Sequence, residues 1–247
     1  MLAPERCIVP LADIDKELAN RGEGRQCFWP APYDKPEAGW GFVLDNLQTW
    51  NEAEQDQQPF PDKQYLADYA HEWIECRRLG RTLITEKCRR MVISWLARGL
   101  ELHAMGLRKT DCVLAGEDLE AAAAHVWRLQ FLYDGLRRRK EQEKDSEWDL
   151  PPCHTLAYKG PLLSSFALPN ASSTRYQNGQ AVGLQGAGTS IITLEEFSTY
   201  RYATKMLAQA KIITQGSPGS VGGFVNVILN ASANPGWQSV KKAVLGR

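Results

Sequence analysis

The chain has 247 residues, 43% of them hydrophobic and 23% charged, which is enough for one large buried core or a core with a small appendage. Lysine plus arginine and aspartate plus glutamate number 29 each, so the overall charge gives no sign of a nucleic-acid-coating or membrane-surface protein. Six cysteines without CxxC spacing predict reduced thiols, and no apolar run is long enough for a signal core or a membrane span. We expect a soluble, cytosolic protein with no membrane partner.

Residues 1–60 are rich in proline and tryptophan and show little apolar periodicity, so we expect an N-terminal arm or linker ahead of a domain over 61–247. The segment 65–80 repeats apolar side chains every three or four residues up to Gly80, which predicts a helix. A short strand over 81–85, the loop TEKCRRMVISW and a helix over 94–105 are expected next.

A second strand is predicted over 111–116, followed by the strongest helical stripe of the sequence, over 117–136. The charge run 137–149 is expected to form a solvated helix end and loop. The alternative is that its three arginines contact phosphates of DNA or of a neighbouring subunit's nucleotide.

Short strands are expected within 154–180, and the continuous apolar run at 189–194 is typical of a strand buried on both faces of a parallel sheet. A helix over 202–213, a glycine-rich segment over 216–223 and a last strand over 224–232 follow. Strands alternating with helices predict an α/β fold with a mostly parallel central sheet.

In such a sheet the loops at the carboxyl ends of the strands become neighbours. The first of these loops holds Lys87 and Ser94 just before a helix, whose N-terminal amides attract anions. It contains no glycine, and Ile93 occupies the place before the serine where a phosphate-binding lysine usually stands. The lysine at the start of the loop can fold back and supply that charge instead.

The second loop begins with Glu195 and Glu196, directly after a buried apolar strand. Carboxylates there are costly unless a cation or hydrogen bonds compensate them, and Mg²⁺ would do so. In P-loop enzymes one such carboxylate orders water around the metal and the next orients the attacking water. The alternative is that the pair marks the point where the strand reaches solvent.

In three places, in order, the chain resembles the ATPase domain of the large terminase subunit, the DNA-packaging motor of tailed bacteriophages. KCRRMVISW (87–95) is similar to that family's deviant Walker A string, GAGTSIITLEEFSTY (186–200) to its Walker B strand, and VILNASANPGW (227–237) to its coupling motif. The strand and alanine-containing helix at 112–136 resemble those that usually follow the loop. The likeness covers roughly residues 60–237 and implies a three-layer P-loop NTPase fold of the ASCE or RecA-like type.

The resemblance implies specific roles, with ATP and Mg²⁺ as cofactors. Glu196 would position water, and Glu195 would assist the metal that Ser94 ligates. Because family members bind adenine just upstream of the loop, Gln64 and Tyr65 are candidate adenine contacts, and the alternative is that they form an ordinary helix start. The phosphate-binding loop would comprise Lys87, Cys88, Arg89, Arg90, Met91, Val92, Ile93 and Ser94, and the coupling motif Ser232, Ala233 and Asn234.

The resemblance further implies double-stranded DNA, a portal protein, a small terminase subunit and a homo-oligomeric ring on the portal as partners, in the host cytoplasm. A neighbouring subunit's arginine would assist hydrolysis, with Arg128 and Arg137, Arg138 and Arg139 as candidates.

Three departures from the family pattern matter, and the first is the absence of glycine from the loop, which the family partly tolerates. Glutamate stands at 195 where the family usually has aspartate, and ten residues follow Trp237 where the family continues into a lid and an RNase H-like nuclease domain. We therefore expect no nuclease activity. The alternatives are a non-hydrolysing terminase fragment that binds DNA, portal or small subunit, a helicase-like P-loop ATPase, and an unrelated α/β domain.

Overall fold

The computed structural model describes residues 27–51, 54–88, 92–142, 150, 152–170, 172–179, 189–215 and 224–230. Its helices are α2 (Gly39–Asn46), α3 (Gln64–Leu79), α4 (Ile93–Leu107), α5 (Leu119–Gln142) and α6 (Ala203–Gln215), with short 3₁₀ turns at η1 (Pro36–Ala38) and η2 (Phe197–Thr199). Its strands are β1 (Gln48–Asn51), β2 (Asp56–Pro59), β3 (Thr82–Lys87), β4 (Asp111–Gly116), β5 (His154–Ala157), β6 (Leu163–Ala167), β7 (Ser173–Asn178), β8 (Ile191–Leu194) and β9 (Phe224–Asn230).

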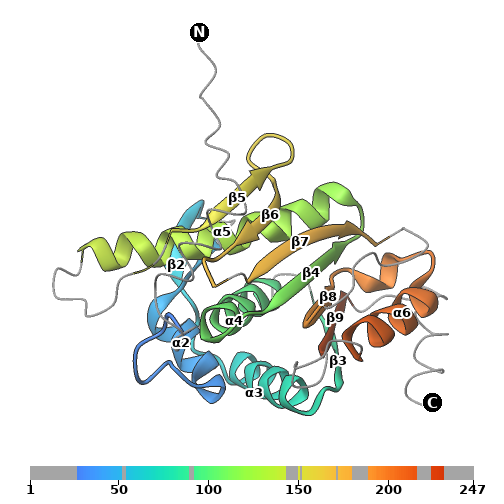
Figure 1. Ribbon diagram of the computed structural model, residues 1–247, viewed down its shortest axis with the longest axis horizontal. Helices are drawn as coiled ribbons and strands as arrows, with labels where there is room; N and C mark the ends of the chain where they lie inside the picture. Colours follow the sequence, from blue (N-terminus) through green and yellow to red (C-terminus); the bar gives the residue numbers. More distant parts are fainter. Residues whose placement is uncertain are drawn as a thin grey trace, which may run out of the picture.

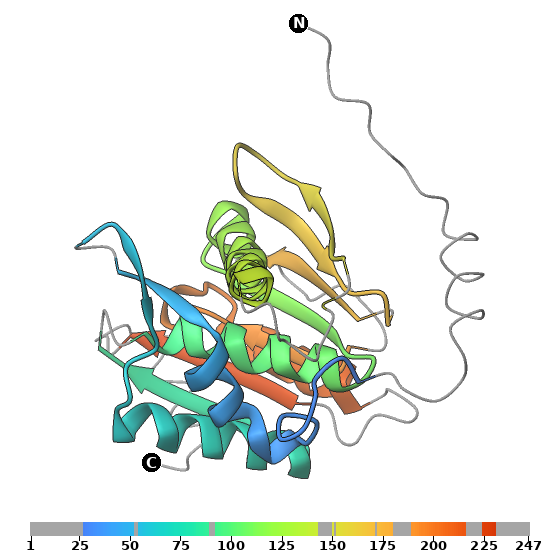
Figure 2. The same cartoon turned by 90° about the vertical axis from the view of Figure 1, so that its left-hand side faces the viewer.

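The main sheet has the strand order β3-β9-β8-β4-β7-β6-β5 (Figure 1). Strands from β3 to β7 pair in parallel, whereas β6 and β5 close the sheet as antiparallel strands beside α5 (Figure 2). The predicted α/β class and mostly parallel sheet are confirmed. The predicted strands and helices from residue 65 onward also occur, each within a few residues of its expected place.

Alternating side chains along the central strands pack into two separate cores, one on each face of the sheet. In β9, Phe224 and Ile228 join the core under α3, α4 and α5, while Val225, Val227 and Leu229 join the core under α6. This period of two places helices on both faces, giving three layers. It also directs Thr193 of β8 toward Glu101 of α4, and Asn226 of β9 toward Tyr69 of α3.

The segment before residue 60 differs from the sequence expectation of little regular structure, because it contains α2 and the β1–β2 hairpin. Phe42 and Val43 of α2 are completely buried against the main core. α2 packs closely on α4, which stabilises it as a helix although it contains glycine. The approach is so close that a Cβ at Gly99 of α4 would lie 2.9 Å from Val43 Cγ2 of α2. The domain boundary at residue 60 stays a prediction.

The helix α3 ends where the sequence predicts, whereas α5 extends further than predicted. Gly80 ends α3 in the left-handed conformation, with φ at +64°, and the Arg81 amide donates to the Cys76 carbonyl at 2.8 Å, as the sequence predicted for that position. In contrast, α5 continues through the arginines of the charge run to Gln142.

Gly106 offers a test of how closely the N-terminal segment packs on α4. A Cβ there would lie 2.1 Å from Cε2 of Trp29, a buried ring whose Nε1 donates to the His103 carbonyl at 2.7 Å. We expect Gly106→Ala to lower the free energy of unfolding by about 1–3 kcal/mol, because the ring must move. Urea-induced unfolding measures this change in the free energy of unfolding.

The matched control is Gly135→Ala in α5, where a Cβ would meet nothing within 4 Å. That change should raise the free energy of unfolding by about 0.5–1 kcal/mol, since alanine favours helix more than glycine does. A Gly106→Ala protein as stable as the wild type would contradict the packing described.

Candidate functional site

Three strand ends meet at one edge of the main sheet. Lys87, the last residue of β3, is in register with Asn230, the last residue of β9, and the glutamate pair follows β8 on the other side of β9. The amide of Glu195 donates to the Ala115 carbonyl at 2.9 Å, which continues the pairing of β8 with β4 beyond the strand. The carboxyl ends of the strands therefore carry the polar groups, as parallel pairing requires.

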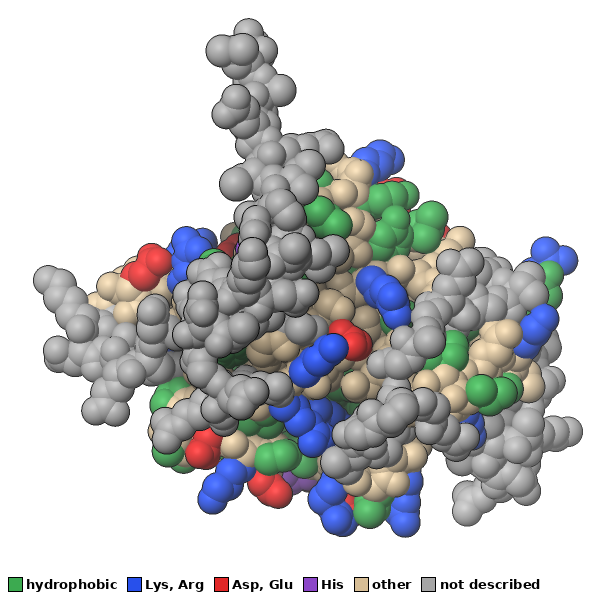
Figure 3. Space-filling view, viewed as in Figure 1, with side chains coloured by type: hydrophobic (Ala, Val, Ile, Leu, Met, Phe, Trp, Pro, Cys, Tyr) green, Lys and Arg blue, Asp and Glu red, His purple; other side chains and the backbone are tan. Residues whose placement is uncertain are grey.

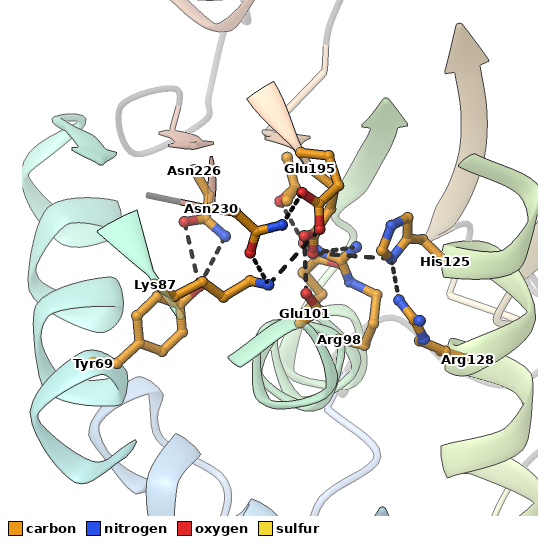
Figure 4. Close-up of polar contacts among 12 residues, drawn as sticks. Tyr69, Lys87, Arg98, Glu101, His125, Arg128, Glu195, Asn226 and Asn230 are labelled. Carbon is orange, nitrogen blue, oxygen red and sulfur yellow. Dashed lines mark hydrogen bonds and ion pairs between the residues drawn. The ribbon is translucent and has the colours of Figure 1, made fainter. Parts of the chain in front are cut away.

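Lys87 reaches across this edge rather than away from it. Its Nζ donates to Asn230 Oδ1 at 3.2 Å and lies 3.8 Å from Glu196 Oε1, and only 10% of its side chain is exposed (Figure 4). The lysine at the start of the loop thus folds back over the end of the neighbouring strand. Its ammonium is within ion-pair distance of one of the two predicted carboxylates.

The loop between β3 and α4 is described at both ends. Cys88 is exposed, Arg89, Arg90 and Met91 lie outside the described residues, and Val92 has φ at +59°. A β-branched residue in the left-handed region is strained, and such strain concentrates at functional sites. Valine here adopts a conformation that glycine would reach without strain.

Ser94 and Glu195 form the second contact across the site. Ile93 is buried and begins α4, and the Ser94 hydroxyl in the first turn donates to Glu195 Oε2 at 2.9 Å. Glu195 is completely buried, so it does not mark a strand reaching solvent. Its Oε1 has no hydrogen-bond partner within the described part of the chain.

Glu196 has different surroundings from Glu195. Its backbone is left-handed, with φ at +53°, 32% of its side chain is exposed, and Asn230 Nδ2 donates to its Oε2 at 2.5 Å. The Glu196 carbonyl accepts hydrogen bonds from the amide and the hydroxyl of Thr199, which hold the turn after β8. One carboxylate is therefore buried beside the serine, and the other is accessible beside the lysine.

Sequence reasoning missed several charged residues beneath this pair. Arg98 and Glu101 of α4 are completely buried and form an ion pair at 2.7 Å, and Arg98 NH1 lies 3.6 Å from Glu195 Oε1 (Figure 4). Burial raises the pKa of Glu101, and Arg98 offsets part of that rise. The signal in the sequence was two charges three residues apart on an otherwise apolar helix.

A neutral histidine completes the surroundings of Glu195. Burial, Arg128 and Arg98 together hold the pKa of His125 well below its usual value. Its Nδ1 lies 2.6 Å from Arg128 NH1, and 3.9 Å from Glu195 Oε1. Because the guanidinium can only donate, Nδ1 accepts, and the imidazole does not act as a cation toward Glu195.

Of the remaining predicted residues, the adenine candidates lie in the first turn of α3. The Gln64 amide donates to Asp68 at 2.8 Å, and Tyr65 is 40% exposed. Their role stays a prediction. Ser232, Ala233 and Asn234 of the coupling motif lie outside the described residues.

The candidate arginines of α5 have contacts within the chain. The Arg128 guanidinium lies 5.4 Å from the centroid of the Trp95 ring, and Arg137 pairs with Glu141 at 3.2 Å on the surface. An Arg139 guanidinium nitrogen donates to the Asp45 carbonyl. None of these contacts selects which arginine would act on a neighbouring subunit.

The described side chains suit a metal ion only when a bound molecule, such as a nucleotide, supplies further oxygen ligands. Within the described ranges, no group of three or more His, Cys, Asp or Glu side chains is arranged to hold a metal ion. Ser94 and Glu195 offer one hydroxyl and one carboxylate with an oxygen that lacks a hydrogen-bond partner in the described chain. That donor set fits Mg²⁺, which usually binds one or two protein groups plus waters and substrate phosphates.

Fold and site together define an α/β protein of the parallel-sheet class, with lysine, serine and two carboxylates gathered where a strand-loop-helix unit meets the sheet edge. Among solved structures, the fold is similar to that of the HK97 bacteriophage large terminase, with a TM-score of 0.57 and 16% identity over 86% of this chain. The match covers 42% of that terminase chain, so this chain spans less than half of its length. The likeness shows a terminase-like fold.

Two other comparisons give no family assignment. A scan against protein-family models finds no match, and a search of curated proteins also finds none. Within the residues that the structure describes, no helix is both long enough and apolar enough to cross a membrane.

Proposed function

We propose that this chain is the ATPase motor domain of a viral large terminase subunit, which hydrolyses ATP with Mg²⁺ to drive double-stranded DNA into a procapsid. One observation carries the proposal. Two contacts at one sheet edge, Lys87 with Glu196 and Ser94 with Glu195, join the loop after β3 to the glutamate pair that follows it by more than a hundred residues. The terminase-like fold supports the same conclusion.

Each side chain has a place in the proposed reaction. The Lys87 ammonium would bind phosphate oxygens, and Ser94 and Glu195 would hold Mg²⁺. When bound, the ion would neutralise charge that develops on the phosphates. Glu196 is accessible and lies beside Lys87, so it orients the attacking water and accepts its proton.

The proposed partners are double-stranded DNA, a portal protein, a small terminase subunit and further copies of the chain in a ring on the portal. On the face in Figure 3, basic side chains along the lower edge are interspersed with acidic ones, in keeping with the neutral net charge. DNA binding should therefore be confined to a local surface and should weaken as salt rises. Turnover by a lone chain should be slow, because such rings complete the site with a neighbouring subunit's arginine.

The test uses the full chain with ATP. We expect a fluorescent ATP analogue to bind more tightly with Mg²⁺ than with EDTA, and phosphate release to require Mg²⁺ and to rise with DNA and portal. Binding without release under all these conditions would favour the non-hydrolysing terminase module. Absence of both binding and release would exclude the ATPase proposal.

A further inference from the structure

A buried charged cluster lies directly beneath the proposed metal site. Arg98, Glu101 and Glu195 are all completely buried, and the arginine lies between the two carboxylates (Figure 4). Arg98 NH2 donates to Glu101 Oε1 at 2.7 Å, and Arg98 NH1 lies 3.6 Å from Glu195 Oε1. Three charges without water around them are costly, so the arrangement stands only if the groups compensate one another.

The two oxygens of Glu195 both face side chains of the same helix. Ser94 and Arg98 are four residues apart on α4, so they project from one face on successive turns. The serine hydroxyl contacts Oε2, and the arginine faces Oε1. The carboxylate thus has a hydrogen bond at Oε2 and a cation at ion-pair distance from Oε1, and both favour one orientation.

Arg98 is in turn fixed by groups that do not touch the proposed metal. Glu101 accepts its hydrogen bond, and Thr193 of β8 donates to the same Glu101 oxygen at 2.6 Å. Neutral His125 lies on a further side of Glu195, with its Nδ1 directed at Arg128. Arg98 is therefore the cation nearest to Glu195 in the described ion pairs.

We propose that Arg98 is a positioning residue that sets the Glu195 carboxylate for metal binding, with Glu101 orienting the Arg98 guanidinium. This inference rests on the proposed function, because it concerns the same metal site. Arg98 does not touch nucleotide. It acts through Glu195, and its removal should weaken the metal while leaving metal-free nucleotide binding unchanged.

The test requires a variant in which the loss of Arg98 does not leave Glu101 as an unpaired buried carboxylate. Arg98→Met combined with Glu101→Gln removes one positive and one negative charge, so the net charge of the cluster is kept. Arg77→Met is the control for losing a packed arginine elsewhere, because Arg77 lies over the Trp73 ring at 5.7 Å on α3. Glu101→Gln alone shows how much of the effect comes from the residue that orients Arg98. Thermal unfolding reports whether each variant is folded.

The experiment measures how the affinity for a fluorescent ATP analogue increases with Mg²⁺. The value compared between variants is the Mg²⁺ concentration that gives half of the maximal increase. For the double variant we expect that concentration to rise about 10- to 100-fold, as loss of groups that orient metal ligands generally does. Binding in EDTA should match the wild type for every variant, and so should the Mg²⁺ dependence of Arg77→Met. Glu101→Gln, whose amide oxygen can still accept a hydrogen bond from Arg98, should give a smaller rise than the double variant. Arg98→Lys keeps a cation without the planar fork and should give an intermediate rise.

The outcomes separate positioning from other roles. A folded double variant with unchanged Mg²⁺ dependence would overturn the proposal, and so would a lower half-saturating concentration, which is expected if Arg98 merely repels the metal. Should the double variant not fold, Arg98→Lys decides, and wild-type behaviour there overturns the proposal. A wild type without Mg²⁺-dependent binding would overturn the proposed function itself.

Discussion

Replacing Glu196 with glutamine is expected to stop turnover while nucleotide binding stays intact. The amide keeps the size of the side chain but cannot accept a proton from the attacking water. Loss of a general base typically costs about a hundred- to ten-thousand-fold in rate, so kcat should fall by that order. Single-turnover phosphate release and equilibrium binding of an ATP analogue measure the two effects separately.

The control is Glu75→Gln in α3, where 51% of the side chain is exposed. Glu75 lies near the end of the helix that leads into the start of β3, whereas Lys87 ends that strand, so both binding and release should stay unchanged. A Glu196→Gln protein that releases phosphate at the wild-type rate would remove the proposed role of this carboxylate.

The contacts of Glu196 also predict how the site changes when ATP binds. Lys87 and Asn230 both contact its carboxylate, and Lys87 also contacts Asn230. Phosphate oxygens at the lysine would compete with the carboxylate for the same ammonium. Glu196 would then be held mainly by Asn230, so the proposed base and the phosphate ligand separate as the substrate enters.

Much of this arrangement follows from the sequence because parallel pairing leaves little choice. Once the apolar runs at β3, β8 and β9 are strands of one parallel sheet, their following loops must share an edge. That is why Lys87 and the glutamate pair were expected together although more than a hundred residues separate them. The pattern did not predict that β9 lies between β3 and β8.

The buried cluster of Arg98, Glu101 and Glu195 was not predicted because it depends on tertiary packing. Arg98 and Glu101 look like ordinary helix charges, three residues apart, and such pairs usually face solvent. Only the packing of α4 on the sheet turns them toward Glu195. In the same way α2 contains glycines that disfavour a helix, and packing on α4 compensates for this weakness. The Phe42 and His103 rings lie 5.0 Å apart, and Gly39, which lacks a Cβ, lets α2 approach Leu100 closely.

Replacing Lys87 with methionine should weaken ATP binding rather than only slow the reaction. A hydrogen bond to a charged group contributes about 1.5–3 kcal/mol, so the dissociation constant for the ATP analogue should rise about 10- to 100-fold. Lys205→Met on the exposed face of α6 is the matched control and should bind as the wild type does. Titration of the analogue in the presence of Mg²⁺ measures the change.

The decisive comparison sets this variant against Glu196→Gln. If Lys87 serves only as the partner of Glu196, either single change breaks the same 3.8 Å contact, both variants behave alike, and the double variant is no worse. If the lysine holds phosphate and the glutamate orients water, Lys87→Met raises the dissociation constant and Glu196→Gln lowers kcat. The double variant then shows both losses, because the two side chains contact each other but act on different atoms of the substrate.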